Sequence, residues 1–180
     1  MCDVDRADPG VFDDRIVFCQ SAAFEGPAAA LGLGMCEGIL AAFYEVNTGG
    51  GVNGCRLELV SRDDGYEPDR AIENTSHLIK VDQVFALIGE VGTPTSKAAQ
   101  PMVAEARVPF IGPITGTGFL RDPSLDTVIN VRASYDQETE GWIEPHHRPR
   151  DLAHSPLLPG RFGMRAHASG CADRRVKRTG

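Results

Sequence analysis

Two hydroxyl-rich turns hold the residues best suited to binding chemistry. The first is residues 92–96 (GTPTS) and the second is residues 115–118 (TGTG). Each follows a short apolar run that ends in glycine. The carboxyl ends of neighbouring parallel strands meet at one edge of a sheet, where ligands bind. Hydroxyls and free backbone N–H groups there suit a carboxylate or phosphate. The turns therefore predict a pocket for a small polar or anionic molecule.

The first turn has two interpretations. Thr93 followed by Pro94 would serve simply as an N-cap and first helical residue. The second turn favours the ligand interpretation, because the two turns would face each other across one crevice. The first turn is not a phosphate-binding P-loop, since no Gly-Lys-Ser/Thr follows it. The glycines at 32–34 also miss the dinucleotide spacing, because Gly38 comes one residue late. No cofactor is expected.

Catalytic and metal-binding groups are not expected either. His77 is the only histidine between residues 15 and 143, so no Ser/His/Asp or Cys/His set can be assembled there. We therefore predict that the chain is not an enzyme. Asp63 and Asp64 are interpreted as a strand-end turn rather than a metal site. The late histidines and a cysteine match no zinc spacing; they are His146, His147, His154, His167 and Cys171.

The elements that position the two turns alternate between strand and helix. Strands are predicted at residues 15–19, 56–60, 84–88, 108–112 and 127–131. Helices are predicted after a flexible turn at 32–34, from Glu67-Pro68 onward, and at 96–106. This order, with crossovers of this length, predicts an α/β fold with a doubly wound parallel sheet, a single Rossmann-like lobe.

Composition is that of a soluble globular protein: 42% of the 180 residues are hydrophobic and 24% are charged. No run approaches the ~18 apolar residues of a membrane span, and the acidic start, residues 1–5, has no apolar segment typical of an export signal. The five cysteines contain no CxxC pair. Cys19 and Cys36 are expected to be buried free thiols.

Charge divides the chain into parts. Residues 1–143 carry a net charge of −12, whereas residues 144–180 carry +5 and are rich in Pro, Arg and His. We expect a flexible lead-in at 1–14, a ligand-binding lobe at 15–143, and a tail at 144–180 that is disordered or out of frame.

The chain resembles a known family at this point. The resemblance rests on residues 17–22 (VFCQSA), 26–32 (GPAAALG), 42–47 (AFYEVN) and 50–54 (GGVNG), and continues through 59–68, 86–96 and 109–123. These segments look like bacterial periplasmic substrate-binding proteins of ABC transporters, of the branched-chain amino-acid (leucine/isoleucine/valine) type. The likeness covers roughly residues 11–143.

The resemblance implies a type I periplasmic-binding fold, in which two Rossmann-like lobes close on a ligand. The first lobe would hold the α-carboxylate and α-amino groups of an aliphatic amino acid or a similar carboxylate or amide. By position, the implied contacts are Thr93, Ile114, Thr115, Gly116 and Thr117. The implied partner is a membrane ABC permease, and the implied location is the periplasm. Because no signal peptide is visible in the sequence, the alternative is a cytoplasmic location for the chain as encoded. Neither nucleic-acid binding nor direct membrane insertion is expected.

The departures from the family define the remaining expectations. Family members are about twice this length, and a second lobe and signal peptide are not seen here. Back-translation of residues 155–164 with chosen codons, read one base later, gives a Tyr-Gln-Asp-Asp segment typical of the second lobe. We therefore expect a one-lobe fragment, truncated or frameshifted near Pro145, with weak or no binding. The alternatives are a ligand-sensing receptor domain of a signalling or amide-regulator system and a flavodoxin-like enzyme.

Overall fold

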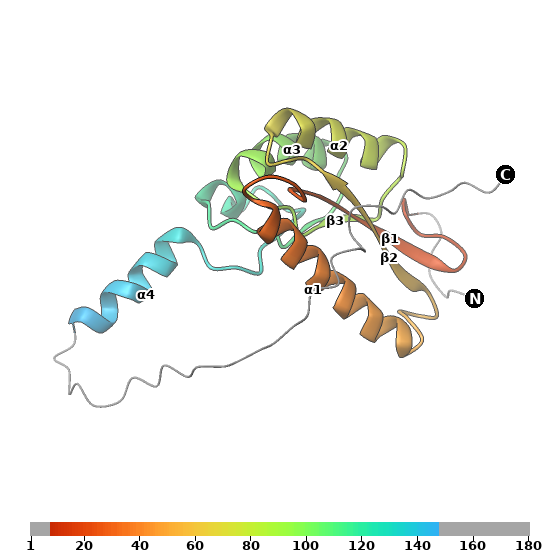
Figure 1. Cartoon of the computed structure of the whole chain (residues 1–180), viewed down its shortest axis with the longest axis horizontal. Coiled ribbons are helices and arrows are strands. Elements are labelled where there is room, and N and C mark those ends of the chain that lie inside the picture. Colours follow the sequence, from red (N-terminus) through yellow and green to blue (C-terminus); the bar gives the residue numbers. More distant parts are fainter. Residues whose placement is uncertain (1–7, 148–180) are drawn as a thin grey trace.

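The sheet is the organising layer of the fold. The computed structural model describes residues 8–147. Five parallel strands lie in the order β2-β1-β3-β4-β5 (Figure 1). They are β1 (Arg15–Ala22), β2 (Arg56–Asp63), β3 (Ala86–Ile88), β4 (Phe110–Ile111) and β5 (Val128–Ile129). The chain moves outward from β1 to β2, then crosses back to β3, so the strand order reverses between β1 and β3. The predicted doubly wound α/β lobe is confirmed.

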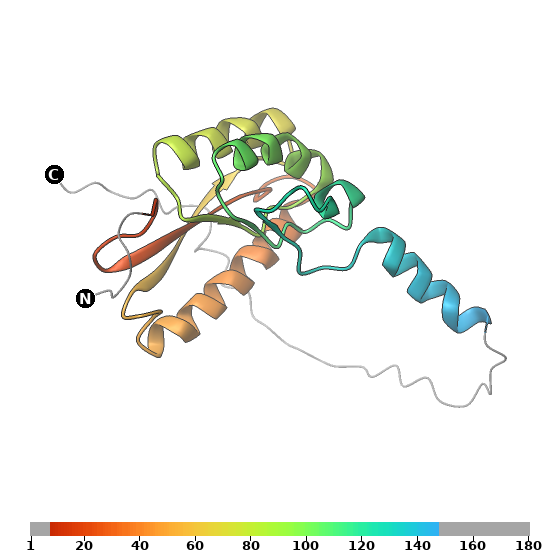
Figure 2. The same ribbon diagram turned by 180° about the vertical axis from the view of Figure 1, so that it is seen from behind.

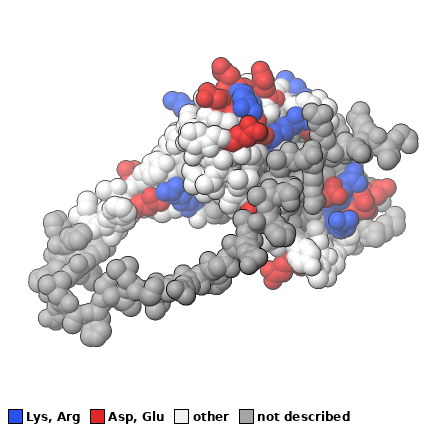
Figure 3. Space-filling view, viewed as in Figure 1, with Lys and Arg blue, Asp and Glu red and all other residues white. Residues whose placement is uncertain are grey.

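The helices cover both faces of the sheet. They are α1 (Ala29–Thr48), α2 (Pro68–Lys80), α3 (Thr93–Glu105) and α4 (Tyr135–His147), with a short 3-10 helix, η1 (Gly118–Arg121). Helix α1 lies on one face, and α2 and α3 lie side by side on the other (Figures 1 and 2). Helix α4 extends away from the sheet. On the face seen in Figure 3, acidic and basic side chains are intermixed over α2.

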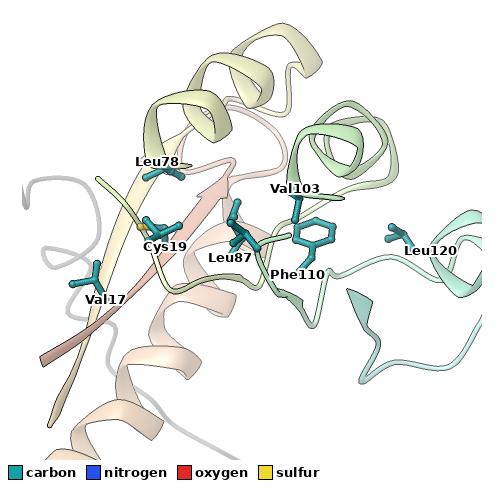
Figure 4. Packing of buried hydrophobic residues seen from close by; sticks show 9 residues of the cluster. Val17, Cys19, Leu78, Leu87, Val103, Phe110 and Leu120 are labelled. Carbon is teal, nitrogen blue, oxygen red and sulfur yellow. The ribbon is translucent and has the colours of Figure 1, made fainter. Parts of the chain in front are cut away.

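The main core lies between the sheet and helices α2 and α3. Leu87 of β3 and Phe110 of β4 are fully buried there, beneath Leu78 of α2 and Val103 of α3 (Figure 4). On the other face Phe18 packs against Phe43 of α1, with ring centres 5.1 Å apart. Burial of both faces is what a parallel sheet requires, and it explains the near-continuous apolar runs of β1 and β3.

Helix α1 begins earlier than predicted. The expected flexible turn at residues 32–34 lies inside the helix, so that expectation is wrong. Gly32 is buried, and a β-carbon built on it would overlap the backbone carbonyl of Ala23. Glycine is used here to let the helix approach the chain just after β1, and not to break the helix.

Helix α1 is also long and apolar enough to cross a membrane by length and composition alone. The sequence had predicted no such segment. Helices that cover a protein core pass the same test, and α1 buries one stripe against the sheet: Gly32, Cys36, Ile39 and Phe43. This spacing is that of a helix with one face on a core.

The two ends of the described chain differ from expectation. Residues 8–14, expected to be flexible, turn back onto the sheet: the carbonyl of Gly10 accepts a hydrogen bond from the N–H of Val17 (2.8 Å). Helix α4 continues through His147, past the expected boundary after Ile143. Residues 148–180, and most of the expected tail with them, lie outside the described residues.

The two cysteine expectations have different outcomes. Cys19 in β1 is a buried free thiol, as predicted, and burial raises its pKa strongly. Cys36 in α1 is buried too, but it is disulfide-bonded, so the prediction of a free thiol is wrong for Cys36.

Candidate ligand-binding site

The first hydroxyl-rich turn forms the start of α3. Gly92 is the N-cap, with a φ of 108° that favours glycine, and Thr93 is the first helical residue. The alternative interpretation of Thr93 as an N-cap is therefore wrong by one residue, and no side chain caps α3. The hydroxyl of Thr95 bonds back to the carbonyl of Val91 (2.7 Å). Because no side chain caps α3, the hydroxyl of Thr93 is available for another partner.

That partner is the second turn. The hydroxyl oxygens of Thr93 and Thr115 lie 2.7 Å apart, and either can donate. The register that brings them together continues past the regular strands. Val91 and Ile114 form a parallel bridge, and the N–H of Ile114 donates to the carbonyl of Glu90 (2.7 Å). The expectation that the two turns face each other agrees with this contact.

The predicted site residues differ in what they present. Thr115 is fully buried, and Thr93 is half-buried. The N–H of Thr117 donates to the hydroxyl of Thr115 (3.3 Å), so its backbone belongs to the same turn. Gly116 is buried in the turn. Ile114 packs into an apolar cluster with Val91 and residues of β1 and α1. Thr93, Thr115 and the 116–117 backbone converge, whereas the Ile114 side chain supports them from the core.

Arg121, at the end of η1, holds this turn in place, and the sequence did not predict it. Its guanidinium donates to the carbonyls of Thr117 (2.7 Å), Arg132 (2.9 Å) and Ala133 (3.0 Å). It also reaches the carbonyl of Thr115 at 3.3 Å. One side chain thus ties the second turn to the segment that leads into α4. A fixed fork of donors suits this use of arginine.

Tyr135, the first residue of α4, is a second residue that the sequence did not predict. Its hydroxyl oxygen lies 3.4 Å from that of Thr115, and a β-carbon on Gly116 would meet the Tyr135 ring at 2.5 Å. Hydrogen bonds from the hydroxyls of Thr115 and Thr93 and from the backbone of Gly116 hold the pKa of Tyr135 below its usual value. The α4 start therefore lies directly on the second turn.

Two carboxylate side chains, Asp64 and Glu90, are buried close enough for the charge of one to act on the other. The carboxylate of Asp64 accepts from the hydroxyl of Ser21 (2.9 Å) and from the N–H of Tyr66 (2.8 Å). These bonds fit its interpretation as a strand-end turn. Glu90 is fully buried, and its carboxylate oxygens have no hydrogen-bond partner among the described residues. Burial first, and the nearby charge of Asp64 second, raise the pKa of Glu90.

The chemistry of the site is that of oxyanion binding. The converging groups are hydroxyls and backbone N–H groups at the amino end of a helix, and all of them donate hydrogen bonds. Among residues 8–143 no group of three or more His, Cys, Asp or Glu side chains could hold a metal ion. Donors of this kind suit a small carboxylate.

Known proteins are similar to this chain in fold and sequence. Residues 21–147 match the family described as periplasmic binding protein. An amino acid binding protein of Pseudomonas aeruginosa is 30% identical over 113 residues, which are 63% of this chain and 30% of that protein. The solved structure of a possible leucine/isoleucine/valine-binding protein from Rhodopirellula baltica is 39% identical, with a TM-score of 0.69, and the match covers 78% of this chain and 37% of that one.

A third relative was solved with a ligand. It is the branched-chain amino acid transporter substrate-binding protein of Streptococcus pneumoniae in complex with isoleucine, 25% identical with a TM-score of 0.62. The match covers 67% of this chain and 34% of that one. The chain thus spans about a third of the length of these three relatives. The chain belongs to the periplasmic binding protein family, and its resemblance to the leucine/isoleucine/valine type is confirmed.

Proposed function

We propose that this chain supplies the first ligand-binding lobe of a solute-binding protein for amino-acid uptake. The observation that carries the proposal is the 2.7 Å contact between the hydroxyls of Thr93 and Thr115. These hydroxyls come from turns that follow β3 and β4, next to the point where the strand order reverses. Ligands of open α/β sheets bind at such a point.

The proposed ligand is a small aliphatic amino acid, held by its carboxylate. The hydroxyls of Thr93 and Thr115 would turn from each other and donate to the carboxylate oxygens. The first N–H groups of α3 would add their own attraction, because a helix N-terminus carries a partial positive charge. The Gly116–Thr117 backbone would line the other side. None of these hydrogen-bond donors is a charged side chain.

A single lobe is expected to bind weakly. Proteins of this family trap ligand between two lobes, and the chain spans about a third of the relatives' length. Half of the contacts would then be missing, and water would compete for every hydrogen bond. We propose dissociation constants in the millimolar range for this chain alone, roughly −4 kcal/mol. Micromolar binding by the chain alone would contradict this part.

The proposed partner is a membrane ABC permease, and the proposed location is the periplasm. Both follow from the family and from relatives named as transporter components. The proposed role is binding and release rather than catalysis, in keeping with a site made of hydrogen-bond donors.

The test is a titration of the ¹⁵N-labelled chain with L-isoleucine, up to tens of millimolar, followed by amide chemical shifts. Saturable shifts should appear at Thr93, Gly116 and Thr117. They should be lost in Thr93→Val and kept in Thr48→Val, a matched change at the exposed end of α1. Shifts that are linear in concentration, or unchanged by Thr93→Val, would contradict the proposal.

A further inference from the structure

The phenol of Tyr135 lies beside the Thr115 hydroxyl, one of the groups proposed to hold the ligand carboxylate. Its oxygen is 3.4 Å from the hydroxyl oxygen of Thr115, which is itself 2.7 Å from that of Thr93. The ring lies against Gly116, where any β-carbon would collide with it. A side chain of the chain itself thus contacts the second turn, next to the Thr93–Thr115 pair that the ligand would use.

We propose that the side chain of Tyr135 itself occupies this site. Its phenol oxygen takes the position of a ligand carboxylate oxygen, so a ligand must displace it. The inference rests on the proposed function, because it takes the same turns as the ligand site.

The donors around the phenol support this assignment. Thr115, Thr93 and the backbone of Gly116 all favour the ionised form of Tyr135 and lower its pKa. Groups that favour a phenolate oxygen are groups that donate to a negative oxygen. A carboxylate oxygen would use the same donors. Tyr135 therefore uses hydrogen-bonding capacity of these turns that a carboxylate oxygen would need.

The segment around Tyr135 holds it over the site. The N–H of Tyr135 donates to the carbonyl of Gly116 (2.8 Å). The guanidinium of Arg132 lies 5.4 Å from the centre of the ring and pairs with Glu138 (2.8 Å). Ser134 and Gln137 form reciprocal bonds at the start of α4. The backbone of Tyr135 is therefore fixed, whatever its side chain does.

The side chain itself can leave at little cost. Tyr135 is 46% exposed, so its rotation into solvent gives up limited apolar contact. Its bond to Thr115 is long at 3.4 Å, against 2.7 Å between the two threonines. Long hydrogen bonds are weak. A ligand that offers a full negative charge would replace the neutral phenol.

The first test compares ligand affinity in tyrosine variants. L-isoleucine is titrated into the wild-type chain, Tyr135→Phe, Tyr135→Ala and the control Tyr44→Phe, whose side chain is exposed on α1. Removal of one competing hydrogen bond should tighten binding roughly 2- to 10-fold in Tyr135→Phe. Tyr135→Ala should bind at least as tightly, and Tyr44→Phe should match wild type. Equal or weaker binding by Tyr135→Phe would overturn the inference and leave the proposed function standing.

The second test needs no ligand. Without isoleucine, Tyr135→Phe should shift the amide signals of Gly116 and Thr117, and Thr115→Val should raise the phenol pKa in an ultraviolet titration. If neither the amide signals nor the phenol pKa changes, Tyr135 does not occupy the site, and the inference is overturned. If both change but no variant binds isoleucine, the proposed function and ligand displacement fail together, while the occupancy stands. Binding by both Tyr135→Phe and Tyr135→Ala, with none detected in wild type, would support both.

Discussion

Gly32 of α1 packs against the backbone of Ala23 so closely that a β-carbon at residue 32 would overlap the Ala23 carbonyl. This contact sets how near the helix lies to the end of β1. It also fixes Phe24, which joins the small core cluster of Cys36 and Val91. Val91 directly precedes the first turn of the site, so a glycine in α1 helps to position the chain that follows β3.

Gly32→Ala should therefore destabilise the lobe, by about 2–4 kcal/mol, because the helix or the chain after β1 must shift. Urea unfolding followed by circular dichroism measures this. Gly38→Ala is the matched control in the same helix: Gly38 is exposed, with no atom near its β-carbon position. That change should stabilise by roughly 0.5–1 kcal/mol through helix propensity. Equal effects at the two positions would contradict the packing role of Gly32.

Arg121 is predicted to stabilise the second turn and the approach to α4. Arg121→Met removes donors to the carbonyls of Thr117, Arg132 and Ala133. The expected loss is about 1.5–3 kcal/mol, as for hydrogen bonds from a charged group. Hydrogen exchange should become faster at the amide of Tyr135, which bonds to Gly116.

The control for this change is Arg107→Met. Arg107 pairs with Asp126 at 3.1 Å, and both side chains are largely exposed. Exposed pairs contribute little, so its effect should stay below about 0.5 kcal/mol, with exchange at Tyr135 unchanged. A similar loss in both variants would mean that Arg121 acts only through its surface charge.

The sequence predicted the fold well because regular elements carry periodic signals. The apolar runs of β1 and β3 and the Glu67-Pro68 start of α2 fall where they were expected. The meeting of Thr93 and Thr115 also agrees with the sequence, since carboxyl ends of neighbouring strands share an edge.

The residues that the sequence missed act through long side chains and irregular backbone. Arg121 reaches the second turn from the end of η1, and Tyr135 reaches it from the first residue of α4. Neither residue type nor spacing indicates these contacts in the sequence. The N-cap of α3 is Gly92 and not Thr93. Its positive φ depends on the folded surroundings, which local sequence patterns do not report. Gly32 was misjudged because a glycine pair suggests a turn, while its real use is a close approach between a helix and a strand end.

The pH dependence of stability should reveal Glu90. Its carboxylate is fully buried without a hydrogen-bond partner among the described residues, and its pKa is raised by burial and by Asp64. Because the pKa of Glu90 is higher in the folded state than in the unfolded state, protonation of Glu90 contributes stability to the fold. The contribution is fully present below the ordinary pKa of glutamate, about 4.3, and is lost as pH rises through the folded pKa. Asp64 is shifted the same way and adds to the trend.

Glu90→Gln removes this titration and keeps the shape of the side chain. The variant should be more stable than wild type at pH 7, by about 1–3 kcal/mol, the scale on which a buried polar group is penalised. The difference should shrink toward pH 4, where wild-type Glu90 is protonated in the folded state and mostly protonated in the unfolded state. Urea unfolding at pH 4, 5, 6 and 7 measures it. Glu105→Gln, exposed at the end of α3, should change stability little at any pH. A gain in Glu90→Gln that is constant from pH 4 to 7 would show that packing, and not the buried charge, separates the two proteins.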